Sequence, residues 1–459
     1  MPADPAGGVN TAEDRSRSVA LRWRGHGSSA AVTRPSPPCN RRVASAGEDY
    51  VMWNPDFSFP LTEGRSEDSL RIALVTETFP PEVNGVAMTL GRTVAGLLQR
   101  GHRVQLVRPR QHRLDQACQD GALAEILVGG IPIPRYPGLR FGMPARSLLQ
   151  RLWAKAPPDI VHVATEGPLG SSAIAAARFL GLPVSSSFHT HFAAYCHHYG
   201  LGWLRGIIAG HLRRFHNRTD ATFVPTHGLA QSLAQDGFRN LIVLSRGVDT
   251  RLFHPGRRSP RLRAAWGVDE HTLVVACVGR MAAEKNLSLA LTAFDALRAR
   301  VAQTRLVFVG DGPLRAAMQR RHPQHIYAGM RHGEDLAEHY ASADLFLFPS
   351  LTETFGNVTT EALASGLAVV AYDHAAAADL IQDGINGRLV PAGDEAAFCQ
   401  TASALAADAS QLQRLRLAAA GSVARLDWER IHDGFTAILG DIVAAHGRRS
   451  SNPFAIVPD

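Results

Sequence analysis

Short apolar runs recur along the chain, and each is followed by a turn of small or polar residues and then by a stretch with helical spacing. The run at 70–76 is typical of a buried parallel strand, and residues 85–98 then place apolar side chains on one helical face. The same order returns at 273–278 and 287–299. Strand, turn, helix and strand make a Rossmann-type unit. The pattern therefore predicts an α/β fold with two Rossmann-like domains.

Further apolar runs predict the other strands of both domains. They cover 104–107, 160–163, 183–188, 306–309, 343–350 and 368–371, and a turn at 383–388 leads into the last strand. Helices are expected at about 395–425 and 428–445. The first turn lacks the G-x-G-x-x-G pattern, so a dinucleotide cofactor is not expected.

The periodicity also predicts the domain organisation. Residues 1–68 have no apolar period and are rich in Ser, Pro and Gly, which indicates a disordered extension. Order is expected in a first domain at 69–248 and a second at 249–427. The helix at 428–445 is assigned to the first domain, and 446–459 is expected to be a flexible tail. We also hypothesise that translation starts at Met52; a peptide mapped upstream of Met52 in native protein would contradict this.

Composition narrows the class of protein. The chain has 459 residues, of which 45% are hydrophobic and 7% aromatic, as in a globular α/β protein of several domains. No apolar run approaches the roughly 18 residues of a membrane-spanning helix, and the start lacks the pattern of a signal peptide. Five scattered cysteines without metal spacing are typical of a reducing compartment. We therefore expect a cytoplasmic protein.

The net charge of +7 is unevenly distributed. Residues 71–248 hold 19 Lys and Arg against 9 Asp and Glu, whereas the rest of the chain is close to neutral. Such asymmetry suggests an anionic partner, either a membrane or a nucleic acid, although solvated arginines on helix faces would give the same count. No stacking or helix-turn-helix pattern supports a nucleic acid. An anionic membrane is therefore the preferred partner for the basic half.

One stretch could provide that contact. Residues 195–218 mix aromatic and aliphatic side chains with four arginines, and the apolar positions Leu204, Ile208, Leu212 and Phe215 share one helical face. This pattern predicts a helix lying on an anionic membrane. The alternative is an ordinary helix packed on its domain.

Several residues suited to binding a ligand lie together at Thr352–Gly366. An apolar strand leads into the turn Phe355–Gly356–Asn357, and a helix starts near Val358. Free backbone N–H groups at a helix start can bind a phosphate. Glu353 and Glu361 bracket this turn, and carboxylates suit sugar or ribose hydroxyl groups rather than phosphate. The alternative is two surface glutamates around a helix start.

A second cluster follows the strand that ends at Gly279. Arg280 and Lys285 come just before a helix start, where the helix dipole disfavours cations. An anion bound between them would resolve this conflict, and a diphosphate fits; a solvated pair of loop residues is the alternative. Lys285 and Lys155 are the chain's only lysines.

These motifs resemble a known family. Two glutamates separated by seven residues, the F-G-N turn, the G-R-x(4)-K segment and the F-H-T segment at His189 are similar to those of retaining glycosyltransferases of family 4, which have the GT-B fold. The resemblance covers about residues 70–445. It implies two facing Rossmann-like domains with a cleft between them, and transfer of a sugar from a nucleoside diphosphate sugar with retention of configuration.

The resemblance also implies roles for individual residues. Arg280 and Lys285 would stabilise the departing diphosphate, Glu353 would bind sugar hydroxyls and Glu361 the ribose, and His189 would contact the sugar. The residues expected to bind the donor are Asn84, Gly85, Gly279, Gly310, Met330, Phe355, Gly356, Asn357, Val358 and Glu361.

Other candidates near the expected site are weaker. His189 and His191 lack a third ligand at a convincing spacing, so no metal is expected. With two lysines in the chain, a pyridoxal-phosphate enzyme of the same fold is not expected, and the nucleotide sugar should need no cofactor. Glu77, Glu82 and Glu166 are candidate nucleophiles by position only, and His162 fits a hydrogen-bonded strand residue better than a catalyst.

The donor and acceptor are less defined. The segments around His162, His189 and Glu353 look most like GDP-mannose-dependent mannosyltransferases, which implies hexosyl transfer to a lipid or a membrane-linked glycan, with the enzyme on the inner face of the membrane. Alternatives are a UDP-sugar-dependent diacylglycerol glycosyltransferase of the sulfoquinovosyl or glucosyl type, and a catalytically silent nucleotide-sugar-binding protein.

Overall fold

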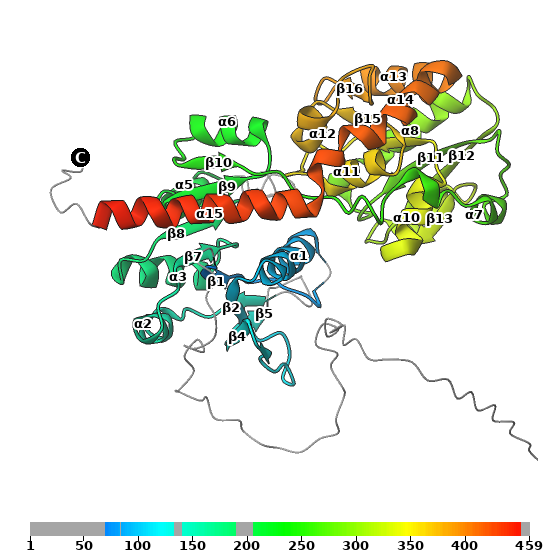
Figure 1. Cartoon of the computed structure of the whole chain (residues 1–459). Coiled ribbons are helices and arrows are strands. Elements are labelled where there is room, and N and C mark those ends of the chain that lie inside the picture. Colours follow the sequence, from blue (N-terminus) through cyan, green and yellow to red (C-terminus); the bar gives the residue numbers. More distant parts are fainter. Residues whose placement is uncertain (1–68, 83, 133–139, 190–204, 451–459) are drawn as a thin grey trace, which may run out of the picture. The chain divides into compact units, whose positions relative to one another are not determined.

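The computed structural model describes residues 69–82, 84–132, 140–189 and 205–450 (Figure 1). The predicted disorder of 1–68, the start at Met52 and the residues His191 and 195–204 lie outside this part of the chain. The described residues form two mainly parallel sheets with helices, as the apolar pattern predicts. We call the parts built around these sheets the first and the second lobe.

The first lobe contains a sheet with the strand order β10-β9-β8-β7-β1-β2-β4-β3, in which only β3 is antiparallel to its neighbour. Its strands are β1 (Arg71–Val75), β2 (Arg103–Pro109), β3 (Gln119–Asp120), β4 (Leu123–Val128), β7 (Ile160–Val163), β8 (Val184–Ser187), β9 (Ala221–Val224) and β10 (Leu241–Val243). A separate hairpin pairs β5 (Gly130–Pro132) with β6 (Arg140–Gly142). Its helices are α1 (Gly85–Gln99), α2 (Arg146–Lys155), α3 (Pro168–Phe179), α5 (Arg205–His216) and α6 (His227–Gln235).

The second lobe contains a parallel sheet with the strand order β13-β12-β11-β14-β15-β16. Its strands are β11 (Leu273–Val278), β12 (Thr304–Val309), β13 (Ile326–Gly329), β14 (Leu345–Phe348), β15 (Ala368–Tyr372) and β16 (Arg388–Val390). Its helices are α7 (Pro260–Ala265), α8 (Leu287–Arg298), α9 (Arg315–Arg321), α10 (Gly333–Ala341), α11 (Asn357–Ala364), α12 (Ala375–Leu380), α13 (Glu395–Ala407) and α14 (Ala409–Ser422), with short 3₁₀ turns at Pro255–Arg257, Ala283–Lys285 and Ala424–Leu426.

Both faces of each sheet are buried. Alternate residues of β11 enter opposite apolar clusters, Val274 and Ala276 on one side and Val275 and Cys277 on the other. In the first lobe β1 divides in the same way between two clusters. Because neither face meets water, strands such as β11 and β15 are continuous apolar runs rather than alternating ones, which is why they can be recognised from the sequence.

The C-terminal helix α15 (Trp428–Ser450) packs on the first lobe, where Phe435 and Leu439 join the cluster around β1 (Figure 1). It continues to Ser450, past the predicted end at Ala445 and into the segment expected to be a flexible tail. The helices predicted at about 395–425 are α13 and α14, and the Asp408 side chain caps α14 by accepting a hydrogen bond from the Gln411 N–H at 2.9 Å.

Candidate active site

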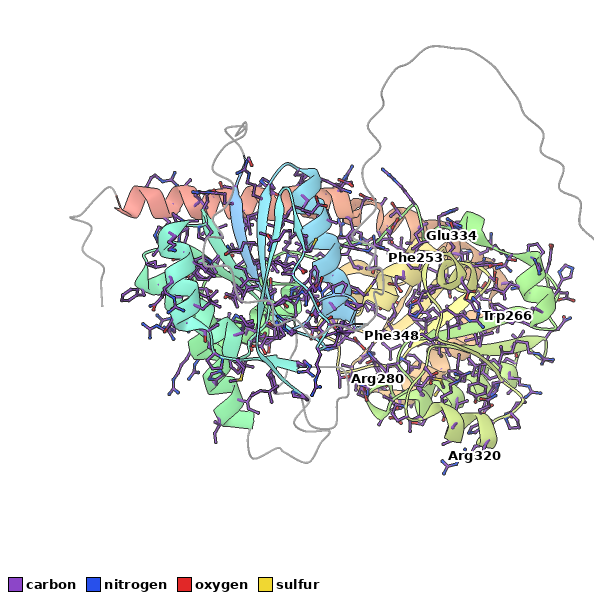
Figure 2. All side chains as sticks on the ribbon, turned by 90° about the horizontal axis from the view of Figure 1, so that it is seen from below. Phe253, Trp266, Arg280, Arg320, Glu334 and Phe348 are labelled. Carbon is purple, nitrogen blue, oxygen red and sulfur yellow. The ribbon has the colours of Figure 1, made fainter. Side chains whose placement is uncertain are left out.

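The candidate site of the second lobe lies where the strand order reverses. β11 and β14 are neighbours in the sheet, but the chain leaves them towards opposite edges, and in open α/β sheets ligands bind at the carboxyl ends of such strands. Arg280 follows β11 and Phe348 ends β14, and both are labelled in Figure 2. The predicted motifs with Lys285 and Glu353 follow these two strand ends.

The turn before α11 is anchored by one aromatic residue and shaped by one glycine. Phe355 is buried in the core, and its carbonyl oxygen accepts a hydrogen bond from the Ala376 N–H at 2.9 Å. Gly356 adopts φ +94°, a left-handed conformation that side-chain-bearing residues rarely adopt. No side chain caps the start of α11 at Gly356. The first N–H groups of the helix, including that of Val358, can therefore serve an anionic ligand.

Lys285 and Glu353 form an ion pair next to this turn. The Lys285 Nζ donates to Glu353 Oε1, and the Ser350 hydroxyl donates to the same oxygen at 2.8 Å. The ammonium group also lies 5.9 Å from the centre of the Phe348 ring. The two charged side chains are 21% and 13% exposed, so the pair can be reached by a ligand.

Arg280 has a different partner. Its guanidinium lies 3.5 Å from Glu284 and is about half exposed. The anion that the sequence requires for these two cations is thus supplied by protein carboxylates in this structure. Their assignment to a diphosphate stays a prediction.

Glu361 is the second glutamate of the motif. The Tyr340 hydroxyl donates to its Oε2 at 2.9 Å, and burial raises the pKa of Glu361 to about 7, although Arg92 and the Tyr340 hydrogen bond oppose the rise. Near neutral pH this carboxyl group therefore exists in both protonation states. It can accept a hydrogen bond from a hydroxyl group in either state, and the ionised state accepts it more strongly.

The predicted donor-binding glycines differ in their surroundings. A Cβ on Gly310 would lie 2.0 Å from the Gly279 carbonyl oxygen, so the turns after β11 and β12 touch each other there. Close approach of two backbones, rather than of a ligand, explains the glycine at 310. Gly279 itself has open space beside it, and Met330, just after β13, is 52% exposed.

In the first lobe, Asn84 caps α1. Its Oδ1 accepts hydrogen bonds from the Val86 and Ala87 N–H groups at 3.1 and 2.8 Å, and its Nδ2 donates to the Thr78 hydroxyl at 2.8 Å. The side chain of Asn84 therefore holds the turn in place. Gly85 has no atom within 4 Å of the position of a Cβ, which leaves its backbone open to a ligand.

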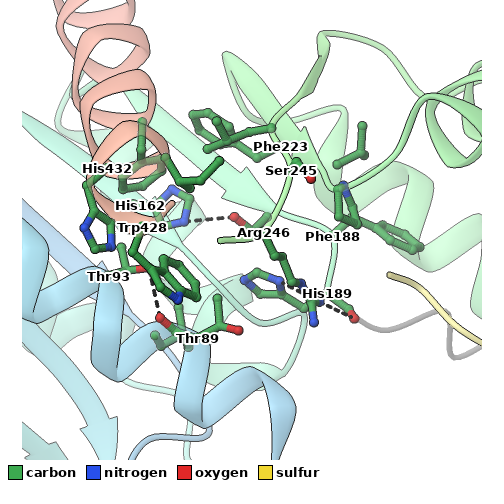
Figure 3. Close-up of a pocket in the computed structure, with 17 residues that line it drawn as sticks. Thr89, Thr93, His162, Phe188, His189, Phe223, Ser245, Arg246, Trp428 and His432 are labelled. Atoms are coloured by element: carbon green, nitrogen blue, oxygen red, sulfur yellow. Dashed lines mark hydrogen bonds between the residues drawn. The ribbon is translucent and has the colours of Figure 1, made fainter. Parts of the chain in front are cut away.

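His189 lies at the end of β8, beside an arginine that the sequence analysis did not single out. Arg246 Nη2 donates to His189 Nδ1 and to the His189 carbonyl oxygen, both at 3.4 Å (Figure 3). Burial and the charge of Arg246 lower the pKa of His189 well below its usual value. Because Nδ1 accepts, Nε2 of the neutral ring carries the proton. This Nε2 is buried and has no partner among the described residues, so it is available to donate to a hydroxyl group.

The cavity beside His189 is small, about 60 Å³, and is lined by residues of α1, β7, β8, β9 and α15 (Figure 3). It has room for several water molecules beside His189. His162 borders it and accepts or donates hydrogen bonds at both ring nitrogens, to Ser185 and Ser187, each at 3.0 Å. Burial lowers the pKa of His162 to about 3. This histidine is a satisfied strand residue, as expected.

Two of the three carboxylates considered as nucleophiles accept hydrogen bonds within the protein, whereas Glu166 has a buried Oε1 without a hydrogen-bond partner among the described residues. Glu77 accepts the Gly142 and Leu169 N–H groups at 2.9 and 3.0 Å, and burial raises its pKa to about 7. Glu82 accepts from the Thr78 hydroxyl and from Gln111 Nε2. Glu166 is buried, with Oε1 3.5 Å from His216 Nε2.

The helix proposed to meet a membrane is partly described, as α5. Leu212 and Phe215 are buried in the first lobe, so these two positions pack within the protein rather than against lipid. Ile207 is 67% exposed, and Arg213 and Arg214 lie on the surface. A membrane contact by this helix would have to use that other face, and it stays a prediction.

Metal ligands and membrane-spanning helices can both be assessed for the described residues. Within them, no three His, Cys, Asp or Glu side chains gather as metal ligands would. No helix in the same part of the chain is both long enough and apolar enough to cross a bilayer.

Comparison with known proteins follows the same division of the chain. Residues 83–252 match a family model described as Glycosyltransferase Family 4, and residues 272–408 match one described as Glycosyl transferases group 1. A GDP-mannose-dependent alpha-mannosyltransferase of Mycobacterium tuberculosis is 34% identical over 83% of this chain and 98% of its own length. A protein of the same description from Corynebacterium glutamicum is 31% identical over 83% of this chain and 91% of its own length.

Solved structures agree on the fold. Sucrose-phosphate synthase from Thermosynechococcus elongatus superposes with a TM-score of 0.66 at 18% identity, covering 82% of this chain and all of that one. WaaG, a glycosyltransferase involved in lipopolysaccharide biosynthesis, superposes with a TM-score of 0.60 at 17% identity, covering 80% and 99% of the two chains. The protein has the GT-B fold and is a hexosyltransferase that belongs to glycosyltransferase family 4.

Proposed function

We propose that this enzyme transfers mannose from GDP-mannose, with retention of anomeric configuration, to a lipid or a membrane-linked glycan. The observation that carries the reaction type is the Lys285–Glu353 pair beside the uncapped start of α11, at the switch point of the second sheet. The donor is inferred from relatives, since three at 31–34% identity are described as GDP-mannose-dependent alpha-mannosyltransferases.

The residues present suit each part of this donor. Arg280 and Lys285 would bind the diphosphate and stabilise the charge that grows on it as the bond to the anomeric carbon breaks. The N–H groups of Phe355 to Val358 would bind the same phosphates. Glu353 would then leave Lys285 and accept hydrogen bonds from sugar hydroxyls, while Glu361 accepts from the ribose.

The engaged carboxylates favour a reaction on one face of the sugar. Glu77 and Glu82 are held by hydrogen bonds, and Glu166 is buried with 9% of its surface exposed, so none of them is presented to a sugar as an accessible nucleophile. In the proposed step the acceptor oxygen forms its bond to the anomeric carbon on the side from which the diphosphate leaves. The acceptor proton passes to a phosphate oxygen of the leaving group, which completes the proton balance without a protein base.

The acceptor is proposed from relatives and charge. Two relatives at 29% identity are described as phosphatidylinositol dimannoside mannosyltransferases, and others as alpha-monoglucosyldiacylglycerol synthases. The basic excess of residues 71–248 suits an anionic membrane. We therefore place the enzyme, as a proposal, on the inner membrane face with a lipid-linked acceptor.

The second candidate is a UDP-sugar-dependent diacylglycerol glycosyltransferase. A sulfoquinovosyl transferase of Arabidopsis thaliana is 33% identical, over 57% of this chain and 52% of its own length. The shorter coverage makes this the weaker proposal.

A thermal-shift panel of GDP, UDP, ADP and their sugars tests the donor, because a ligand that binds only the folded state raises the melting temperature. We expect GDP and GDP-mannose alone to raise it by several degrees. A response to UDP-sugars alone would replace the mannosyl proposal with the diacylglycerol branch. Protein that binds a donor but neither hydrolyses nor transfers it would indicate a silent nucleotide-sugar-binding protein.

A further inference from the structure

Arg246 follows β10, at the end of the first lobe's sheet, and is buried with 9% of its surface exposed. Its guanidinium is held loosely. Besides the two contacts with His189, Nη1 donates to Asn357 Oδ1 at the long distance of 3.5 Å. Nε is buried and has no partner among the described residues. The group therefore retains hydrogen-bonding capacity that the protein does not use.

Other buried arginines of this chain have carboxylate partners. Arg108 lies 2.7 Å from Asp115 and 3.0 Å from Glu125, and Arg263 lies 3.3 Å from Asp344. For Arg246, no Asp or Glu of the described residues is within ion-pair distance. Burial accordingly lowers the pKa of Arg246 to about 10, and only the more distant charge of Glu353 opposes this. A buried cation without a partner destabilises a fold, so its retention calls for an anion from outside.

The surroundings indicate where that anion binds. The guanidinium carbon lies 5.8 Å from the centre of the Phe355 ring, and Asn357 belongs to the same turn. This is the turn whose N–H groups open α11. Glu353, whose field acts on Arg246, is also the partner of Lys285. Arg246 and Lys285 thus border the same turn from different elements.

We infer that Arg246 binds the diphosphate of the donor, as a third cation beside Arg280 and Lys285. This inference rests on the proposed function. A guanidinium can donate two parallel hydrogen bonds to phosphate oxygens, which a lysine cannot do. Arg246 would thereby link the departing charge to His189, whose ring it also orients.

A phosphate series separates this role from a structural one. Affinities of guanosine, GMP and GDP are measured for the wild type and for Arg246→Met, which keeps an apolar stem against Phe355 but removes the charge. We expect guanosine binding to change less than about twofold and GDP binding to weaken by about 10- to 100-fold, the effect of losing a hydrogen bond to a charged group. Arg246→Lys, which keeps the charge but loses the paired donors, should fall between them.

The melting temperature of Arg246→Met is a second measurement, and it is expected not to fall although the affinity for GDP does. Without ligand, Arg246→Met should melt at the wild-type temperature or above it, because it removes an unpaired buried charge. A lower melting temperature together with an equal loss of affinity for all three ligands would show a structural role and overturn the inference. Arg239→Met, which removes an exposed arginine just before β10, is the matched control and should leave all affinities unchanged.

The wild-type measurements separate this inference from the proposed donor. If the wild type prefers uridine nucleotides, the donor assignment fails, and the same series with uridine, UMP and UDP tests Arg246. If the wild type binds a nucleoside diphosphate and Arg246→Met binds it equally well, the inference alone is wrong. If the wild type binds none of them, both are wrong.

Discussion

Lys285 and Glu353 form an ion pair in this structure, and each is expected to take a new partner when the donor binds. The Lys285 ammonium lies 5.9 Å from the centre of the Phe348 ring, and the Ser350 hydroxyl donates a hydrogen bond to Glu353. Two side chains paired in this way already lie at the site where the donor is proposed to bind. Their exchange of partners would replace one partly buried electrostatic contact with another, so it requires little rearrangement.

Replacing either residue should abolish transfer without unfolding the protein. We expect Lys285→Ala and Glu353→Ala to lower the transfer rate by at least about 100-fold, because a preorganised charge facing the leaving group or the sugar is lost. Transfer is measured with labelled GDP-mannose and a lipid extract. Lys155→Ala, at the end of α2, is the matched control and should retain full activity. Near-normal activity of either site variant would contradict the assignment.

Glu361 makes stability depend on pH. Its pKa is about 7 in the folded protein and 4.5 in the unfolded chain, so between these values the folded state binds more protons. Its stabilising contribution is therefore complete below about pH 4.5 and is lost as the pH rises through 7.

The free energy of unfolding should fall between pH 5 and pH 8, and Glu361→Gln should make this fall smaller by about 1 to 3 kcal/mol. Urea titrations at four pH values measure it. A residual fall is expected from Glu77, whose pKa is raised in the same direction. Glu334→Gln changes an exposed glutamate and should leave the slope as it is. A slope in Glu361→Gln equal to the wild-type slope would contradict the prediction.

At the scale of elements, β2 and β4 are joined by a buried ion cluster as well as by their ladder. Arg108 on β2 pairs with Glu125 on β4 and with Asp115 in the connection between them. The same connection carries Gln111, which donates to the Phe79 carbonyl oxygen at 2.6 Å and so reaches the turn before Asn84. The cluster thereby supports a predicted donor-binding turn from outside the site.

Arg108→Met should destabilise the protein by about 3 to 5 kcal/mol, because Asp115 and Glu125 would remain buried without their cation. Urea unfolding followed by circular dichroism measures this. Arg178→Met breaks the 3.9 Å contact of an exposed arginine with Asp220 and should cost less than about 1 kcal/mol. Equal effects of the two variants would contradict the buried cluster's importance.

Most of the central strands could be predicted because they are buried on both faces. β11 appears in the sequence as an unbroken apolar run, β1 is apolar after Arg71, and β7 is interrupted only by His162. β4 was not predicted, since Glu125 lies inside it and is paired with Arg108 and the Cys118 N–H, partners that cannot be seen from the sequence alone. The turn before α11 was predictable from local residues. Arg246 could not be predicted as a site residue. What marks it is that no carboxylate of the described residues pairs with it, and only the structure shows this.

At the scale of the whole molecule, the C-terminal helix α15 packs against both lobes. Ile431 near its start packs against a cluster of the second lobe, whereas Phe435 and Leu439 belong to a cluster of the first. Its crossing with α1 is close, since a Cβ on Gly96 would lie 2.1 Å from His432 Nδ1. Both ring nitrogens of His432 are buried without a partner among the described residues.

A double-mutant cycle tests this crossing. Gly96→Ala should destabilise the protein by about 1 to 3 kcal/mol through overpacking against His432. In a His432→Ala background the same change should be neutral or stabilising, because alanine favours a helix over glycine. Gly434→Ala, where a Cβ would make only an ordinary 3.6 Å contact with Leu244, is the control. Additive effects in urea unfolding would show that α1 and α15 do not meet as described.

The scarcity of lysine has a practical consequence. Besides the chain's N-terminal amine, an acylating reagent directed at primary amines meets two targets in this protein, Lys155 and Lys285. Lys285 is tied to Glu353 and would be covered by a bound donor, whereas Lys155 would react at the same rate throughout. Acylation of Lys285 therefore reports whether the site is occupied, and acylation of Lys155 serves as the internal standard. Mass spectrometry of the two peptides would give the fraction of enzyme that holds a nucleotide sugar, even in an unpurified membrane preparation.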